Sequence, residues 1–476
     1  MVNRSNAAAL ACDDPPQANF RPLAMLVGCA FFMEQLDSTI IAPAIPSMAK
    51  AFAVEPLRLN LAMTLYLLLL VIFVPVSGAL ADRFGTRRVF CAAVGIFTAS
   101  SLACGFAQDL NTLLLARAVQ GIGAALMVPV GRMAMVRATR PSELVAAMAW
   151  MVTPAMLGPL LGPPLGGLIV TWSGWPWIFW VNVPIGLVGL YVGRRLVPHF
   201  AVAECRRIDW LGWLILSCAA SALIIGLDLS HHPVHRHQLA PGLLGGSVLG
   251  ALMYWLHARR HPAPLLDFSL VRISTFKVAL VSGSVVRIGY GALPFLLPLA
   301  LQLGMGLSAV HSGLVMAGSA LASMLVKATT VKILRRFGFR TVLIVNGVLC
   351  AAGIAACAAL SPQWSLQAIM GLLLVSGISR SVQFNAVGSL AYADMERSHT
   401  GAATSLNSTF QQLAAAIGIA LCVWLLDFFA ARAGQDEPVL HSYALTFLAL
   451  GLVTLAAVPI CFGLARDAGN ALSGRA

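Results

Sequence analysis

Long uncharged stretches alternate with short charged loops along the whole chain. Residues 59–81, 89–108 and 144–193 contain no Asp, Glu, Lys or Arg. Because about 20 apolar residues cross a bilayer as a helix, the first two stretches predict one span each and the third predicts two. The sequence TWSGWPW at residues 171–177 marks the turn between those two spans.

The same pattern, followed to the end of the chain, predicts fourteen membrane-spanning helices and therefore an all-α membrane protein. An even number of spans places both termini on the same side of the membrane. The predicted helices cover residues 23–45, 60–81, 89–108, 110–132, 144–170, 175–196, 210–228, 239–257, 275–300, 310–331, 341–360, 364–390, 402–428 and 440–464.

Composition and charge support this interpretation and orient the helices. Hydrophobic residues make up 59% of the 476 residues and charged residues 10%, against about 45–50% and about 25% in soluble domains. Lys and Arg concentrate in alternate loops, and only Lys50, Arg58, Arg236 and Arg432 fall in loops on the other side. Because basic loops stay in the cytoplasm, both termini are predicted to be cytoplasmic. The net charge of +13 then indicates topology and attraction to anionic lipid, with no nucleic-acid partner.

Two of the charged loops are nearly the same. Residues 83–87 read Arg-Phe-Gly-Thr-Arg, and residues 336–340 read Arg-Phe-Gly-Phe-Arg. The loops follow the second and the tenth predicted helices, which indicates a repeat of six helices with two further helices inserted. Parallel repeats of this kind are typical of transporters that rock two halves about a central site. Chance recurrence of RFG beside basic loops is the alternative interpretation.

The duplication predicts the domain organisation. Two six-helix bundles are joined by a linker that carries the two inserted helices. The predicted parts are a cytoplasmic N-terminus at 1–22, the first bundle at 23–196, the linker with the inserted helices at 197–273, the second bundle at 274–464 and a cytoplasmic tail at 465–476.

Four motifs resemble those of a known transporter family. The segments at 78–90 (GALADRFGTRRVF), 113–125 (LLLARAVQGIGAA) and 158–167 (GPLLGPPLGG) are similar to the loop, helix-4 and helix-5 motifs of the major facilitator superfamily. LDSTIIAPAIP at 36–46 is similar to the helix-1 motif of its fourteen-span drug:proton antiporter branch, the EmrB/QacA type. The motifs occur in the family's order, and the resemblance covers essentially the whole chain.

Within that branch, the chain most resembles bacterial exporters of the MdtD type. This resemblance rests on WIFWVNVPIG at 177–186, the FGFR of the second loop and QQLAAAIG at 411–418. It implies the major facilitator fold, with two six-helix bundles plus two inserted helices, and export driven by proton antiport. Two residues depart from the family pattern: Thr86 replaces a residue that is often basic, and Arg335 stands where the first loop has Asp82. We therefore expect the second loop to have lost the gating role.

The first loop is predicted to act as a gate. Asp82 lies where the second and third helices meet. Its carboxylate is expected to pair with Arg83 or Arg87, and with a helix N-terminus, in only one of two arrangements of the halves. An ordinary topology marker is the alternative, although a loop that needs only positive charge does not need an acid. The motif residues of this gating loop are Gly78, Asp82, Arg83, Gly85 and Arg87.

The helix-5 motif combines regularly spaced glycines with prolines. Glycines four residues apart share one smooth face of a helix, which allows close packing. The prolines remove backbone donors and bend the helix. Plain packing and a functional hinge both agree with this spacing, and the family resemblance favours a role in antiport. The motif residues are Gly158, Pro159, Gly162, Pro163, Gly166 and Gly167.

Two acids and one arginine are the candidates for proton coupling. Glu34 and Asp37 are three residues apart on the first helix, so they share a face on which like charge and desolvation favour a bound proton. Arg117 keeps a fixed positive charge that favours proton release from a nearby carboxylate. The alternatives are interhelical hydrogen bonding for the acids and a static ion pair for Arg117.

Polar residues of later helices are candidates for the substrate cavity. A charged side chain at mid-bilayer costs at least about 2.5–3.5 kcal/mol, so it faces a cavity or a partner. Arg287 and Arg380 are such residues, and an anionic or chelating substrate is one partner for them. Water, or an acid nearer the surface such as Asp228 or Asp427, is the alternative. Neutral side chains that line a cavity or join helices complete the candidates, namely Asn385, Asn182 and Gln411.

Neither a cofactor nor a metal site is predicted. The segment HHPVHRH at 231–237 holds four histidines. Pro233 disrupts their helical spacing and no acid or cysteine lies among them, so we expect a solvated loop. The sequence contains no GxxxxGK[ST] phosphate-binding loop, so we expect an ion gradient or a partner to drive any pumping. The family resemblance implies that this gradient is a proton gradient.

We interpret the chain as a proton-coupled exporter of small molecules, of the multidrug type, in a bacterial inner membrane. It is not expected to be an enzyme. Its expected partners are the substrate, protons and the lipid bilayer; we expect a monomer, and nothing in the sequence indicates a periplasmic adaptor. An exporter of anionic metabolites or metal chelates on the same fold remains an alternative. A non-transporting membrane sensor is a further alternative, disfavoured because the sequence keeps the antiporter motif and has no sensory domain.

Overall fold

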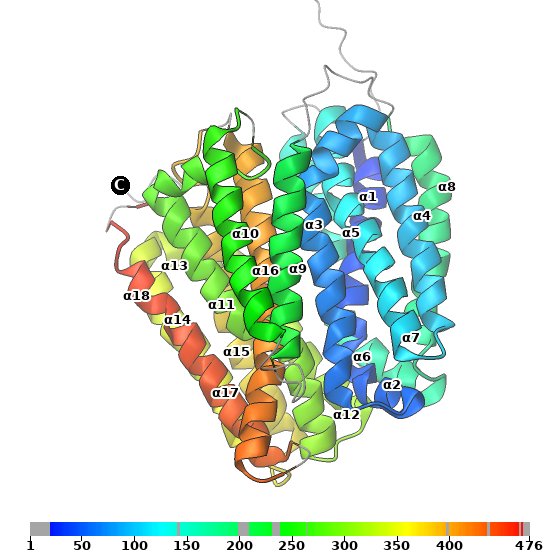
Figure 1. The fold of residues 1–476 in the computed structure, drawn as a ribbon, viewed down its shortest axis with the longest axis vertical. Helices are drawn as coiled ribbons and strands as arrows, with labels where there is room; N and C mark the ends of the chain where they lie inside the picture. The colour runs from blue at the N-terminus through cyan, green and yellow to red at the C-terminus, as the bar shows by residue number, and fades with distance from the viewer. Residues whose placement is uncertain are drawn as a thin grey trace, which may run out of the picture.

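The computed structural model of the protein consists of helices joined by short loops (Figure 1). All regular elements of its described residues are helices, in agreement with the predicted all-α class. The described part of the chain covers residues 20–469 except 140–142, 199–208, 231–238, 263, 397–398, 436–437 and 466–467. The histidine-rich segment 231–237 therefore lies outside the described residues.

The first half of the chain forms one group of packed helices. Within it, α1 packs against α6, and α5 packs against α3 and α4. The helices are α1 (Phe20–Ile40), α2 (Ile45–Phe52), α3 (Asn60–Phe84), α4 (Thr86–Gly105), α5 (Leu110–Ala138), α6 (Leu144–Trp172), α7 (Trp177–Trp180) and α8 (Asn182–Leu196).

The second half of the chain forms a similar group, which follows the inserted helices α9 (Trp210–Leu229) and α10 (Ala240–Arg260). Here α11 packs against α16, and α15 packs against α12 and α14. The helices are α11 (Ser274–Leu299), α12 (Ala309–Leu325), α13 (Lys327–Phe337), α14 (Phe339–Ala356), α15 (Leu366–Leu390), α16 (Thr400–Arg432), α17 (Leu440–Leu455) and α18 (Ala457–Cys461).

Helices occupy every position at which a membrane span was predicted. By the length and composition of the described residues, 12 of them are long and apolar enough to cross a membrane. The two others are α10, whose glycines and polar residues lower its hydropathy, and α12, which has 17 residues and gives way to α13 at Val326. The count of fourteen spans therefore stays a prediction.

The inserted pair packs at the seam between the halves through only one of its helices. In Figure 1, α9 and α10 stand side by side at the front of the molecule. Helix α9 contacts α3 of the first half and α16 of the second. The Trp213 indole Nε1 donates to the carbonyl of Ile72 (2.9 Å), which fixes α9 to α3. Helix α10 packs mainly against α9 and exposes apolar side chains such as Leu249 and Met253.

The two halves share a hydrophobic core at one end of the molecule and have separate cores at the other. We call the end that carries the Gly85 and Gly338 loops the loop end, and the opposite end the far end. At the far end, Met48 of the first half and Leu296 of the second belong to one cluster of buried side chains. At the loop end, Phe90 and Phe339 belong to two separate clusters. Apart from a small cluster in which α3 and α16 meet beside α9, the apolar contact between the halves is therefore concentrated at the far end.

Candidate functional site

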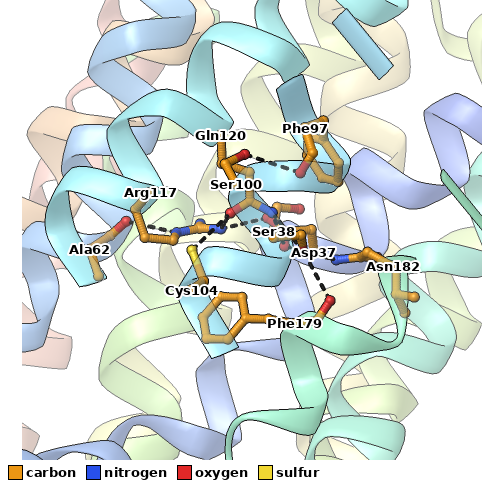
Figure 2. A network of polar contacts seen from close by, with 12 residues as sticks. Asp37, Ser38, Ala62, Phe97, Ser100, Cys104, Arg117, Gln120, Phe179 and Asn182 are labelled. Atoms are coloured by element: carbon orange, nitrogen blue, oxygen red, sulfur yellow. Dashed lines mark hydrogen bonds and ion pairs between the residues drawn. The ribbon is translucent and has the colours of Figure 1, made fainter. Parts of the chain in front are cut away.

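A buried ion pair lies in the interior of the first half (Figure 2). Asp37 on α1 accepts from Arg117 on α5, with 2.6 Å between Oδ2 and Nη1. Gln120, one turn further along α5, donates from Nε2 to Asp37 Oδ1 (2.8 Å) and accepts from Arg117 Nη1 (2.7 Å). All three side chains are buried. Two helices are thus joined by a closed set of charge-assisted hydrogen bonds.

Two further helices contribute polar groups to the same carboxylate. The amide of Asn182 on α8 donates to Asp37 Oδ1 (3.1 Å) and to the hydroxyl of Ser101 on α4 (3.2 Å). That hydroxyl in turn donates to the carbonyl of Phe179 (2.9 Å). Asp37 therefore sits where α1, α4, α5 and α8 meet, and Asn182 Oδ1 is left without a hydrogen-bond partner among the described residues.

Two glycines of the helix-4 motif bring Arg117 and Gln120 to this position. A Cβ atom at Gly121 would lie 2.8 Å from the carbonyl oxygen of Tyr66 on α3, and one at Gly123 would lie 2.7 Å from a backbone nitrogen of α4. No larger residue fits at either place without separating the backbones. The glycines therefore let α5 approach both neighbours, while the residues before them turn toward α1.

Arg117 is held by a third helix as well. Its Nε donates to the carbonyl of Ala62 on α3 (3.2 Å), and its guanidinium lies over the ring of Tyr66, 4.4 Å from the centroid. A cation over an aromatic face is attracted to it, more strongly when water is excluded. The side chain is 1% exposed. Its charge is therefore balanced within the protein by Asp37, a carbonyl and a ring.

Glu34 does not join the Asp37 network, although it shares the predicted face of α1. The side chain is 8% exposed. It interacts electrostatically with Arg132, which lies further along α5 toward the loop end. Asp37 is thus ion-paired with Arg117, whereas Glu34 interacts electrostatically with Arg132 and with Asp37 itself.

Asp82 pairs with a different arginine from the two that were expected. Its Oδ1 lies 2.7 Å from Arg137 Nη2 at the end of α5, and both side chains are about one third exposed. Arg83 points elsewhere because neighbouring residues on a helix do not face each other; its guanidinium lies over Phe84. Arg87 donates to a main-chain carbonyl. The observed pair joins α3 to α5 within one half, so it does not bridge the two halves.

Gly85 and Gly338 play the same structural part in the two similar loops. Their φ angles are +89° and +76°, a region that favours glycine because it has no Cβ. In each loop, the arginine two residues later donates to the main-chain carbonyl that follows the last helix of its own half. These bonds join Arg87 to Val197 (2.5 Å) and Arg340 to Phe462 (3.2 Å). The sequence repeat is therefore also a structural repeat. Gly78, the other glycine of the gating-loop motif, lies on α3 and faces open space.

The helix-5 motif lies on α6 and faces α1, the helix that carries Asp37. A Cβ atom at Gly158 would lie 2.8 Å from the backbone nitrogen of Leu36. Gly162 and Gly166 face the following turn of α1 in the same way. The glycine face thus holds α6 against α1 beside Asp37.

The same part of α6 also contacts the second half. A Cβ atom at Gly167 would overlap the carbonyl of Ala309 on α12, and one at Gly313 on α12 would overlap the carbonyl of Pro163. Pro159 and Pro163 lie inside α6 and leave backbone carbonyls without helical donors. Helix α6 therefore connects the Asp37 helix to the other half of the protein.

The second half presents two arginines and two aromatic rings between α11 and α15. The guanidinium of Arg287 lies over the ring of Phe384, 4.5 Å from its centroid, and that of Arg380 lies 5.9 Å from the centroid of Tyr290. Both arginines are half-buried, and their charges repel each other. The positive candidates for the substrate cavity are thus brought together on two helices.

The neutral cavity candidates lie in three different surroundings. The amide of Asn385 on α15 donates to the hydroxyl of Ser381 (3.3 Å). Gln411 is half-buried on α16. Asn182 is fully buried and donates to Asp37, which favours the alternative that it joins helices. Its place in the first half follows from α8 packing against α1 and α4.

A family profile matches the chain twice. The profile of the Major Facilitator Superfamily aligns with residues 27–419 and again with residues 279–471. The chain belongs to the major facilitator superfamily. The second alignment begins inside α11, the first helix of the second half, and agrees with the internal repeat.

Several relatives of this major facilitator protein cover nearly its whole length. It is 36% identical over 432 residues to a protein from Salmonella heidelberg (strain SL476) described as "Putative multidrug resistance protein MdtD", an alignment that covers 90% of this chain and 91% of that protein. A protein of the same description from Salmonella typhi has the same identity and coverage. The predicted resemblance to MdtD-type exporters is confirmed.

Solved transporter structures share the fold at low sequence identity. A POT family transporter in complex with 5-aminolevulinic acid has a TM-score of 0.69 at 16% identity, covering 93% of this chain and 95% of that one. The human organic anion transporter MFSD10 (TETRAN) has a TM-score of 0.63 at 14% identity, covering 94% and 100%. These matches confirm the major facilitator fold.

Three members of the polar sites were missed in the sequence. Gln120 follows Arg117 by one helical turn, and that spacing was a usable signal. Ser101 gave no signal, because hydroxyls are frequent in membrane helices. Arg132 was assigned to the end of a helix, although α5 continues to Ala138. The role of each of these residues depends on a partner that lies on another helix.

Proposed function

We propose that this major facilitator transporter is a proton-coupled exporter of small molecules in which Asp37 binds the transported proton. The observation that carries the proposal is the buried Asp37–Arg117 pair with its neutral donors Gln120 and Asn182. A carboxylate at such depth is stable only when it is paired or protonated, so it has two chemically distinct states. The description of the MdtD relatives supports cargo of the multidrug type.

Protonation of Asp37 changes what holds α1 to α5. In the ionised state, the carboxylate accepts from Arg117, Gln120 and Asn182. In the protonated state, the carboxyl donates its proton to an acceptor, and the unpartnered Asn182 Oδ1 supplies one after the amide rotates. Arg117 then keeps the carbonyl of Ala62 and Gln120 Oε1 as neutral acceptors. The ionic attraction between the two helices is lost.

Helix α6 is the route by which this change reaches the second half. Its glycine face holds α1 beside Asp37, and its next turn touches α12. A shift of α1 therefore changes both the α1–α6 contact and the α6–α12 contact. Since the two halves meet at the far end in this structure, the opposite state separates them there and closes the loop end.

The proposal includes a bacterial inner-membrane location with the loop end and both termini in the cytoplasm. The basic residues of the two similar loops support this orientation, because short basic loops stay on the cytoplasmic side. The proton gradient supplies the energy, and the transporter works without a cofactor. A single chain carries the complete polar site, which supports action as a monomer.

A transport assay in proteoliposomes with an imposed pH gradient tests the proposal. Asp37→Asn keeps the shape of the side chain and one acceptor oxygen but cannot bind and release a proton. We expect gradient-driven transport of a cationic dye to be abolished while the protein remains folded. Asp109→Asn is the matched control, because Asp109 is exposed and Asn also caps α5. Full pH-driven transport by Asp37→Asn would exclude Asp37 as the coupling residue.

An exporter of anionic metabolites or metal chelates is the second candidate function. The half-buried Arg287 and Arg380, whose charges repel each other, favour it. An anionic group placed between two guanidinium groups relieves their repulsion and accepts strong hydrogen bonds from them. Phe384 and Tyr290 add aromatic faces for the remainder of such a substrate.

A further inference from the structure

A cluster of potential metal ligands lies at the loop end of the inserted helices. Asp209 directly precedes α9, and His257 and His261 lie four residues apart at the end of α10. One carboxylate oxygen and one ring nitrogen from each histidine all lie within 4.8 Å of one another. None of these residues belongs to the proposed proton or substrate sites.

The side chains are close to the geometry of a metal site. His257 Nε2 lies 2.8 Å from Asp209 Oδ1, and the rings of His257 and His261 are stacked with centroids 5.3 Å apart. Metal–ligand bonds of about 2.0–2.1 Å in a tetrahedral zinc site place ligand atoms about 3.3 Å apart. Small side-chain rotations therefore suffice. Histidines at i and i+4 are also the spacing with which one helix face binds zinc.

Asp209 keeps one oxygen without a partner in a buried position. The residue is 5% exposed. Its Oδ1 accepts from the backbone nitrogen of Gly212 (2.8 Å) and contacts His257, whereas Oδ2 has no hydrogen-bond partner among the described residues. Buried carboxylate oxygens are normally paired. A bound cation balances the charge of this carboxylate and so compensates for the missing partner.

The cluster is only partly buried, because both of its histidines are half-buried. The side chain of His257 is 19% exposed. Trp210 follows Asp209 in the sequence and Trp255 precedes His257 by two residues, and both are exposed, as expected for aromatic residues at a membrane–water interface. Arg259, the arginine nearest to His257 in the sequence, has its guanidinium over the ring of Trp255, 4.0 Å from the centroid.

We propose that Asp209, His257 and His261 bind a divalent transition-metal ion of the Zn²⁺ type. Two imidazoles and one carboxylate suit such ions, with water as a fourth ligand. The ion links the start of α9 to the end of α10 at the loop end. It therefore stabilises the contact between the two inserted helices, since α10 packs mainly on α9. The proposal is independent of the export function.

Metal binding by the purified full-length protein in detergent tests this site. The protein carries a tag without histidine, is treated with a chelator, and has His231, His232, His235 and His237 replaced by Asn to remove a competing cluster. Co²⁺ binding is followed by its visible absorption, Zn²⁺ by competition with Co²⁺, and stability by the melting temperature. We expect one ion per chain and a melting temperature that rises with Zn²⁺ concentration.

Single substitutions then locate the ion. His257→Gln, His261→Gln and Asp209→Asn should each weaken binding more than about tenfold, and Asn at 209 keeps the helix cap. His311→Gln, an exposed histidine elsewhere, should bind as the parent does. Absence of Zn²⁺ binding in the parent overturns the proposal, as does unchanged affinity in the His257 and His261 variants. If His257→Gln lowers the melting temperature but the parent does not respond to Zn²⁺, His257 only forms a hydrogen bond with Asp209. That result would also overturn the metal-site proposal.

Discussion

The Asp37–Arg117 pair is both the candidate for coupling and a source of instability when broken. Both side chains are out of contact with solvent. Removing one partner of such a pair costs about 3–5 kcal/mol, because the other charge remains buried without compensation. Gln120 and Asn182 reduce this penalty only in part, since they supply dipoles in place of a charge.

The stability of charge variants should therefore be strongly non-additive. We expect Arg117→Gln to lower stability by about 3 kcal/mol and the double variant Asp37→Asn/Arg117→Gln to recover most of that loss. Arg137→Gln breaks the exposed pair with Asp82 and should lose less than about 1 kcal/mol. Melting temperatures in detergent provide the measurement. Equal melting temperatures for the single and double Arg117 variants would contradict the argument.

Selectivity for cargo charge should depend on the arginines of the second half. If an anionic group binds between Arg287 and Arg380, Arg287→Gln or Arg380→Gln removes a charge-assisted hydrogen bond and weakens anion binding about tenfold or more. Cationic dyes should bind equally well or better. Arg272→Gln, an exposed arginine at the loop end, is the matched control. Anion transport that is unchanged in both variants would rule out this second function.

At the scale of elements, the glycines of α6 decide how tightly the Asp37 helix is held. The nearest atoms to a Cβ at Gly158 include the backbone of Leu36, and backbone cannot move aside as a side chain does. The close approach of α1 and α6 is therefore sensitive to a single methyl group. The arrangement also explains why the motif glycines are spaced by four residues, which keeps them on one face.

Two Gly→Ala substitutions, one at a helix contact and one at an open position, distinguish this packing effect from a change in helix propensity. Gly158→Ala should push α1 and α6 apart, lower the melting temperature and reduce pH-driven transport about tenfold or more, because the second half is reached through α6. Gly95→Ala on α4 meets open space and should leave transport unchanged while raising stability by up to about 1 kcal/mol. Transport by Gly158→Ala at the parent rate would show that this contact does not transmit the change.

At the scale of the whole molecule, the distribution of hydrophobic cores defines one state of the transport cycle. The far end is closed by a core that both halves build, whereas each half has its own core at the loop end. Burial of apolar surface is the main stabilising term in such contacts. A state that opens the far end must therefore gain equivalent contacts at the loop end.

Cysteine labelling tests which end is accessible. In a background without the native cysteines, Asn385→Cys on the loop-end part of α15 should react with a membrane-impermeant maleimide added from the loop side. Met48→Cys, at a fully buried position of the far-end core, should be protected from reagent added on the far side. Faster reaction of the cysteine at position 48 would indicate that the open end is the opposite one.

The sequence by itself determined the all-helical membrane class, the repeat and the family. Uncharged length is a local property, so residues 59–81 and 89–108 predict α3 and α4 directly. The rarity of charge in the membrane also pointed to Asp37 and Arg117 before any contact was known. Uncharged length also predicts a span at 239–257, but the low hydropathy of α10 leaves that span a prediction.

Only the tertiary structure decided which residues are partners. Asp37 accepts from Arg117, Asp82 pairs with Arg137, and Asp209 meets His257 across the inserted pair. In each case the two residues lie on different helices, and their distance depends on how those helices rotate and how closely their backbones approach. Glycines that contact helices distant in the sequence determine how closely those backbones approach each other. A local sequence pattern names the charges, but helix packing determines the partner of each one.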